Sequence, residues 1–364
     1  MKDILNFLYM MNSEEKNISD NVIIEAYKEI LNINNKEKSN IFINSLFTYL
    51  ILKRKDSKLI TKLLKISFEK DGFVPYIENA KSRNNNPIIL LAGSGKKGIK
   101  TINVSTTAAI VATSLGANII KPCSMATSSI SGSFDFLNSI GVNTKLSIND
   151  TRYLLKRTGF GIFPIEKLIP KFDTIYGDVF YAPNILSYAL AALICPIKPE
   201  IVLYGLANNG VEISGEVLEQ FNVKQYRIVS SNTNNLYYMD ELNIFGESTV
   251  YDSYDKNKKV YKFSEKLKLP SYTSDDIKQS TNVIDNIKKS LCVLEGKNTG
   301  AYEELIALNA GNILQLSGIC DTIEEGYAMA KEEIKTGKCI EHLRKIIIEG
   351  NGSIDKFERI IKER

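Results

Sequence analysis

The sequence predicts an α/β protein with a small N-terminal helical domain, residues 1–85, and a larger α/β domain, residues 86–364, built on a mostly parallel central sheet. Two observations indicate this fold. Apolar residues recur at helical spacing through the first 72 residues, with no strand pattern among them. From Asn86-Pro87 onward, short apolar runs that suit buried strands alternate with helical patterns, which is typical of a parallel sheet.

The N-terminal region is expected to form several amphipathic helices. Apolar residues between Ile23 and Leu31 follow a helical period, and Ser19-Asp20 in front of them supplies an N-cap signal. Ile41–Leu52 and Leu59–Phe68 show two further helical patterns. Later helices packing against this region are expected to complete the domain.

The second region alternates between the two kinds of pattern. Strands are expected at Ile88–Gly93, Ala117–Lys121, Ile201–Leu206 and Tyr226–Ser231. Helices are expected at Ser105–Leu115, Phe134–Ile140 and Thr322–Thr336, with helical character from Tyr302 onward. The segment Tyr251–Asp276 is polar, and its pattern favours neither helix nor strand.

Composition excludes several classes of function. The net charge of +4 is too small to indicate a nucleic-acid-binding protein. One histidine, His342, and five cysteines without metal-ligand spacing do not favour a His- or Cys-based site, and the cysteines suit reduced thiols. We expect a cytoplasmic protein without membrane attachment, because no signal peptide and no apolar run of roughly 18–20 residues is found.

A glycine-rich segment, Gly93–Ala112, connects a predicted strand to a predicted helix. Backbone amides and the dipole at a helix N-terminus favour an anion. Gly93, Gly95 and Gly98 permit close backbone approach, while three lysines, Lys96, Lys97 and Lys100, add positive charge. The segment therefore predicts a site for a phosphorylated ligand. The alternative is a structural glycine turn with a Ser/Thr helix cap.

Two further segments carry polar groups suited to the same ligand. Lys121–Asp135 places a lysine at a strand end, followed by a loop rich in hydroxyl groups. Asp240-Glu241 is a pair of adjacent acids of the kind that binds Mg²⁺ beside substrate phosphates. The alternatives are a polar loop and two solvated acids.

In this order the three segments resemble the anthranilate phosphoribosyltransferase family, also called glycosyltransferase family 3, over about residues 20–345. The Gly-Ser-Gly-Lys-Lys-Gly run at 93–98 and the Thr-Ile-Asn-Val-Ser-Thr run at 101–106 align with the family's loop without a gap. Lys121–Asp135, Asp240-Glu241 and Leu308–Gly311 match its later motifs.

The resemblance implies a fold like that of nucleoside phosphorylases and phosphoribosyltransferases, a homodimer, and transfer of 5-phosphoribosyl from phosphoribosyl diphosphate with the help of Mg²⁺. It implies Mg²⁺ ligation by Ser105, Asp240 and Glu241, and no side-chain nucleophile. The residues implied to bind phosphoribosyl diphosphate are Gly93, Ser94, Gly95, Thr101, Asn103, Ser105, Thr106, Lys121, Ser129 and Ser133.

The sequence also departs from the family's pattern. Lys96-Lys97 stands where the family has Gly-Asp, and Pro122-Cys123-Ser124-Met125 where it has His-Gly-Asn-Arg. The stretch Asn184–Pro199 lacks the arginine expected to contact the carboxylate of anthranilate. The donor and metal motifs are thus partly retained, while the acceptor motifs are not.

Three functions fit this pattern. The first is a phosphoribosyltransferase acting on another, less acidic aromatic or amine acceptor. The second is a divergent anthranilate enzyme of tryptophan biosynthesis. The third is a non-catalytic relative that binds a nucleotide or nucleic acid through Lys96, Lys97 and Lys100.

Overall fold

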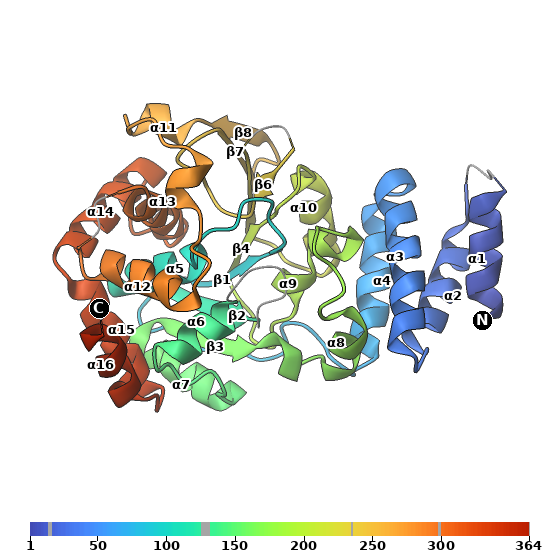
Figure 1. Cartoon of the computed structure of the whole chain (residues 1–364), viewed down its shortest axis with the longest axis horizontal. Coiled ribbons are helices and arrows are strands. Elements are labelled where there is room, and N and C mark those ends of the chain that lie inside the picture. The colour runs from blue at the N-terminus through green and yellow to red at the C-terminus, as the bar shows by residue number, and fades with distance from the viewer. Residues whose placement is uncertain (14–16, 125–131, 234–235, 298–299, 364) are drawn as a thin grey trace.

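The structure is a computed structural model that describes the chain except for residues 14–16, 125–131, 234–235, 298–299 and 364. Four helices form an N-terminal layer, in agreement with the helical pattern of the sequence. They are α1 (Lys2–Asn12), α2 (Asp20–Leu31), α3 (Lys36–Lys53) and α4 (Ser57–Glu69). This layer stands at one end of the molecule, and α1 is its outermost helix (Figure 1).

An eight-stranded mixed sheet forms the centre of the α/β region. The strand order is β3-β2-β1-β4-β5-β7-β8, with β6 paired to β5. The first five strands run parallel, whereas β6, β7 and β8 pair antiparallel at one edge. The bounds are β1 Ile88–Gly93, β2 Asn118–Cys123, β3 Phe160–Pro164, β4 Ile201–Gly205, β5 Tyr226–Asn232, β6 Tyr238–Met239, β7 Glu247–Asp252 and β8 Lys258–Tyr261.

The four predicted strands are confirmed to within about two residues, but four others were not predicted. The parallel strands β1 and β4 are continuous apolar runs because helices cover both faces of the sheet, and β2 is buried along its whole length although it includes Asn118 and Lys121. Strand β3 was missed because its five residues include Gly161 and Pro164, which read as loop residues. The polar edge strands β7 and β8 owe their pairing to β5 rather than to their own composition.

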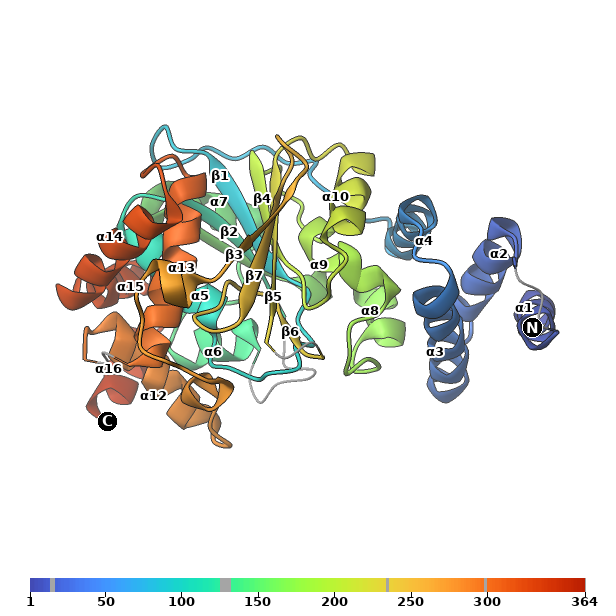
Figure 2. The ribbon, with the colours of Figure 1, turned by 90° about the horizontal axis from the view of Figure 1, so that it is seen from above.

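Helices cover the sheet in two layers with separate apolar cores. Figure 2 shows the sheet edge-on, with the C-terminal helices on one face and α9 and α10 on the other. The first layer holds α5 (Val104–Ser114), α6 (Ser133–Ser139), α12 (Val283–Leu294), α13 (Ala301–Leu316), α14 (Ile323–Lys335), α15 (Lys338–Glu349) and α16 (Ile354–Lys362). The second holds η2 (Ile185–Tyr188), α9 (Leu190–Leu193) and α10 (Val211–Gln220).

The strand order places a binding region at the carboxyl ends of β1 and β4. The chain leaves β1 toward β2 on one side, and β4 lies on the other side, so the crossover direction reverses between these two strands. In open α/β sheets, ligands bind in the crevice outside such a reversal. The loops after β1 and β6 both reach this point.

Helix α8 (Pro170–Tyr176) connects the N-terminal layer to this region. Asp71, which follows α4, accepts hydrogen bonds from the backbone amides of Lys171 (2.7 Å) and Phe172 (2.9 Å) at the start of α8. Phe47 of α3 stacks on Phe180 with ring centroids 5.4 Å apart. The helical layer thereby fixes the segment that forms one wall of the pocket.

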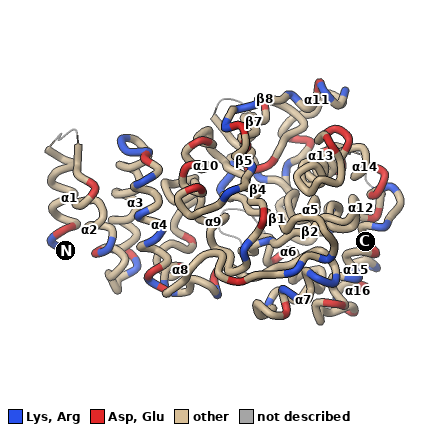
Figure 3. Tube along the Cα trace, turned by 180° about the vertical axis from the view of Figure 1, so that it is seen from behind, with Lys and Arg blue, Asp and Glu red and all other residues tan. Residues whose placement is uncertain are grey.

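Charge is distributed without a dominant sign. Lys and Arg are scattered over the trace together with Asp and Glu (Figure 3), in keeping with the small net charge. None of the helices in the described part of the chain is long and apolar enough to cross a membrane.

The single histidine, His342 on α15, is held neutral within the helical layer. Its Nε2 lies 3.0 Å from Thr113 Oγ1 on α5. Burial, reinforced by Arg83 and Lys345, lowers the pKa of His342 to about 3. The unfolded chain therefore binds a proton below about pH 6.5 that the folded chain does not bind.

We expect the free energy of unfolding to decrease as the pH falls from about 6.5, by roughly 1.4 kcal/mol per pH unit from this group. Urea unfolding at pH 7.5 and 5.5 measures this loss in the wild type and in His342→Gln. The loss should be smaller in His342→Gln, because the substitution removes the proton-binding site. Equal losses in the two proteins would contradict the assignment.

Candidate functional site

A cavity of about 260 Å³ opens at the carboxyl ends of β1 and β2. It brings together every described residue that the sequence nominated: Gly93, Ser94, Gly95, Thr101, Asn103, Ser105, Thr106, Lys121, Ser133, Asp240 and Glu241. The nominated Ser129 lies outside the described residues. Segments more than 100 residues apart in the sequence thus share one pocket, and their individual roles stay predictions.

The glycine loop after β1 is fastened to the neighbouring strand and to Asp240. The amide of Ser94 donates to the carbonyl of Gly205 (2.8 Å), and the amide of Gly95 donates to Asp240 Oδ2 (2.9 Å). A Cβ at Gly93 would lie 2.5 Å from Asp240 Oδ2, and one at Gly205 would lie 1.8 Å from the Asp240 carbonyl oxygen. Glycine is required at Gly205 because the backbone of the loop carrying Asp240 packs directly on it, whereas a larger residue at Gly93 would have to displace the Asp240 carboxylate.

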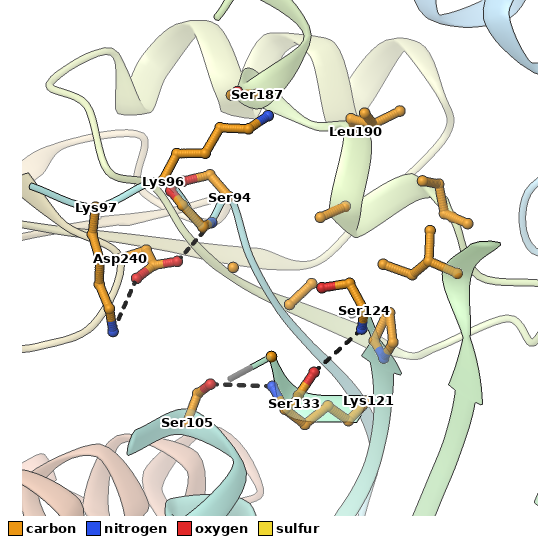
Figure 4. A pocket seen from close by; sticks show the side chains of 18 of the residues that line it. Ser94, Lys96, Lys97, Ser105, Lys121, Ser124, Ser133, Ser187, Leu190 and Asp240 are labelled. Atoms are coloured by element: carbon orange, nitrogen blue, oxygen red, sulfur yellow. Dashed lines mark hydrogen bonds and ion pairs between the residues drawn. The ribbon is translucent and has the colours of Figure 1, made fainter. Parts of the chain in front are cut away.

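Lys121 places a buried ammonium group beside the start of α5. Its Nζ lies at the end of β2 and donates to Ser105 Oγ (3.1 Å; Figure 4). The residue is 4% exposed, and burial lowers the pKa of the ammonium. No ion pair to Lys121 is found among the described side chains. A buried cation of this kind favours an anionic ligand in the cavity.

The carboxylates of Asp240 and Glu241 follow β6 and face Lys97. Lys97 Nζ lies 2.8 and 2.9 Å from the two carboxylate oxygens of Glu241 and 3.8 Å from Asp240 Oδ1. The side chains of Lys97, Asp240 and Glu241 are only 14%, 8% and 6% exposed. Burial pulls the pKa of Lys97 down, but the two carboxylates outweigh this and raise it, so the ammonium stays charged.

The pair as arranged does not fit a divalent ion. Both Glu241 oxygens already accept from Lys97, and the predicted third ligand, Ser105, accepts from Lys121. A metal between the carboxylates would meet the Lys97 ammonium. In the part of the chain that the structure describes, no three His, Cys, Asp or Glu side chains gather as a metal-binding group.

Lys96 points away from Lys97, toward the opposite wall of the pocket (Figure 4). Its backbone adopts a left-handed conformation, with φ at 57°. The ammonium lies 4.6 Å from the ring centroid of Tyr176 and 5.5 Å from that of Phe180, and donates to Tyr176 Oη (3.0 Å). The adjacent residues Lys96 and Lys97 thus contact opposite sides of the cavity.

Residues 165–194 form this opposite wall, and the tertiary fold carries them to the pocket. The part from Asn184 onward belongs to the stretch that the sequence comparison already identified, whereas residues 165–183 contain no recognisable motif and were missed by sequence reasoning. The apolar lining residues are Ile165, Ile169, Tyr176, Phe180, Leu190, Ala191 and Ile194. Three acidic residues, Glu166, Asp173 and Asp178, join them, and no arginine lines the described pocket.

Asp173 on α8 is the most perturbed carboxyl group of this wall. Burial, together with the nearby charges of Glu166, Asp178 and Asp71, raises its pKa to about 6, while Lys36 opposes this rise. The acidic wall is therefore well suited to a neutral or positively charged group and poorly suited to a carboxylate.

Comparison with known proteins agrees with this geometry. The sequence profile of the glycosyl transferase family α/β domain matches residues 85–340. The chain belongs to this family. Among curated members of the glycosyl transferase family, the anthranilate phosphoribosyltransferase of Helicobacter pylori (strain G27) is 27% identical over 355 residues, covering 95% of this chain and 98% of that protein. The enzyme of Bacillus cereus (strain B4264) is 29% identical over 274 residues, covering 74% and 77%.

Solved structures of glycosyl transferase family members share the fold. Anthranilate phosphoribosyltransferase from Thermus thermophilus superposes with a TM-score of 0.74 at 20% identity, covering 96% of this chain and 98% of that one. The Saccharomyces cerevisiae enzyme in complex with PRPP and Mg gives a TM-score of 0.77 at 18% identity, with the same coverage. The predicted architecture of N-terminal helices and a mostly parallel sheet is confirmed.

Proposed function

We propose that this glycosyl transferase moves a 5-phosphoribosyl group from phosphoribosyl diphosphate to an aromatic or amine acceptor that carries no carboxylate. The observation that carries the donor assignment is Lys121, a buried ammonium beside the N-terminus of α5 without an ion-pair partner among the described residues. An anionic phosphate there pairs with the ammonium and with the helix dipole.

The acceptor assignment rests on the charge of the opposite wall. Glu166, Asp173 and Asp178 line it, and no described lining residue is an arginine. Without a guanidinium partner, a buried carboxylate on the acceptor loses roughly 2–5 kcal/mol of binding free energy, or about two to three orders of magnitude in affinity. Tyr176 and Phe180 supply flat apolar surface for an aromatic ring.

The proposed reaction joins the acceptor nitrogen to C1 of the ribose while the bond from C1 to diphosphate breaks and the amine loses a proton. The positively charged lysines of the pocket stabilise the negative charge that develops on the departing diphosphate. Burial of the site keeps water from C1 and strengthens these interactions. Mg²⁺ is the expected cofactor of the family, but we assign it no step here because Lys97 already holds Glu241.

The observations favour a small phosphorylated ligand over an oligonucleotide. Lys97 is held inside the pocket by carboxylates, and Lys96 by the rings of Tyr176 and Phe180. Neither lysine contributes to an open basic surface of the kind that tracks a phosphate backbone. The homodimer expected from the resemblance also stays a proposal.

Diphosphate release tests the function directly. Phosphoribosyl diphosphate is supplied with matched amines, such as aniline, 2-aminobenzamide and anthranilate. We expect release with the uncharged amines, and a KM for anthranilate at least about 100-fold higher. No donor binding and no release with any amine would refute the proposal. Growth of a tryptophan auxotroph on this gene would instead favour the divergent anthranilate enzyme.

A second prediction concerns Asp173 and pH. With an aromatic amine that bears a separate fixed positive charge, we expect kcat/KM to rise roughly tenfold as the pH passes about 6, because Asp173 loses its proton and attracts the cation. Asp173→Asn should abolish this rise. Asp178→Asn, a matched change in the same segment, should retain it, and an unchanged profile in Asp173→Asn would contradict the assignment.

A further inference from the structure

Every N–H donor of the Lys97 ammonium group has a hydrogen-bond acceptor within the protein. Its ammonium has three N–H donors, and three acceptors surround it: Glu241 Oε1 at 2.8 Å, Glu241 Oε2 at 2.9 Å and Thr101 Oγ1 at 2.7 Å. Thr101 lies four residues further along the same loop. The ammonium is therefore held both by the carboxylate it neutralises and by the loop that carries it.

Lys97 also gives the site a positive charge of its own. Three lysines, Lys97, Lys100 and Lys121, line the donor end of the pocket with the two carboxylates of Asp240 and Glu241, whereas Lys96 turns to the opposite wall with its own acidic residues. The groups of the donor end have a formal surplus of one positive charge without any added ion. A diphosphate group approaching them meets attraction rather than the repulsion of a bare carboxylate pair.

We infer that the ammonium of Lys97 takes the place of a divalent metal at Asp240-Glu241, so that this site receives a diphosphate-bearing ligand without a metal ion on the carboxylate pair. A covalently attached cation needs no recruitment from solution and cannot be removed by a chelator. Lys97 is thus a positioning residue that neutralises Glu241 and holds the glycine loop against it.

The same arrangement leaves one acceptor for the ligand. Asp240 Oδ2 accepts from the amide of Gly95, whereas Asp240 Oδ1 is buried with no hydrogen-bond donor among the described residues. A buried carboxylate oxygen of this kind is costly unless a donor reaches it. A hydroxyl group of the bound ligand supplies that donor directly, so Asp240 serves as a hydrogen-bond acceptor rather than as a metal ligand.

Titration of Mn²⁺ against the intact protein, without substrate, tests the inference by calorimetry and by the electron paramagnetic resonance signal of the free ion. We expect no stoichiometric site in the wild type. Lys97→Gln should create one, raising the affinity for Mn²⁺ by about tenfold or more, because the freed carboxylates attract the ion. Lys96→Gln removes the same charge from the adjacent residue and should create no site. Stoichiometric Mn²⁺ binding by the wild type would overturn the inference, whether or not Lys97→Gln folds.

Diphosphate binding supplies the second measurement and rests on the proposed function. Inorganic diphosphate should bind the wild type with the same affinity, within about twofold, in EDTA and in Mg²⁺. Binding that appears only with Mg²⁺ would overturn the inference while leaving the donor assignment intact. Absence of diphosphate binding under both conditions would count against the proposed function, and the Mn²⁺ titration would still decide the role of Lys97.

Discussion

Replacing Lys121 with methionine should strongly weaken donor binding and yet stabilise the protein. We expect the affinity for phosphoribosyl diphosphate to fall by roughly 100-fold to 1000-fold, because a buried phosphate loses its cation. In the free protein the same change removes a buried charge whose hydrogen bond goes to the neutral Ser105. The free energy of unfolding should therefore rise by about 1–3 kcal/mol.

A fall in donor affinity together with a rise in the free energy of unfolding is expected only of a ligand-binding lysine. If Lys121 were structural, its truncation would destabilise the protein, and donor binding would fall as a consequence. Calorimetric titration with the donor and urea unfolding of the same preparation separate the two cases. Lys145→Met, a change at an exposed lysine, serves as the control and should alter neither quantity. Loss of stability in Lys121→Met would show that Lys121 belongs to the scaffold.

Of the substitutions proposed here, Arg227→Leu should lower the free energy of unfolding the most. Arg227 on β5 forms a two-pronged ion pair with Asp252 on β7, with Nε to Oδ1 at 2.6 Å and Nη2 to Oδ2 at 3.0 Å. Its Nη1 donates to Asn312 (2.8 Å) and Gln315 (2.7 Å) on α13. Both charged side chains are buried, so the substitution leaves an uncompensated carboxylate and costs about 3–5 kcal/mol.

Urea unfolding measures this loss, and a double variant shows its cause. Arg227→Leu combined with Asp252→Leu removes both charges and should recover most of the stability, because the penalty belongs to the unpaired carboxylate. If the double variant is as unstable as the single one, packing of Arg227 against α13 is responsible instead. Arg157→Leu, at the exposed pair with Glu349, should have little effect.

Much of the fold follows from local sequence pattern. Strands β1 and β4 are buried on both faces and are therefore continuous apolar runs, and the N-terminal helices carry a clear helical period. Strands β3, β7 and β8 lack such a signal because their pairing partners, and not their own residues, make them strands. Their existence depends on the sheet already being present.

The sequence by itself predicted which segments share the pocket, and it did so through their order along the chain. A glycine loop before a helix, a lysine at a strand end and an acidic pair each have a structural alternative when taken alone, but together they predict one site. The tertiary structure alone decided the rest. It placed Lys97 beside Glu241 and Lys96 beside Tyr176, and it brought Asp173 to the opposite wall of the pocket from a segment without a motif. The physical reason is that a lysine side chain spans several ångströms and binds whichever acceptor the fold places within reach. The partner of a charged residue is therefore a property of packing and not of sequence spacing.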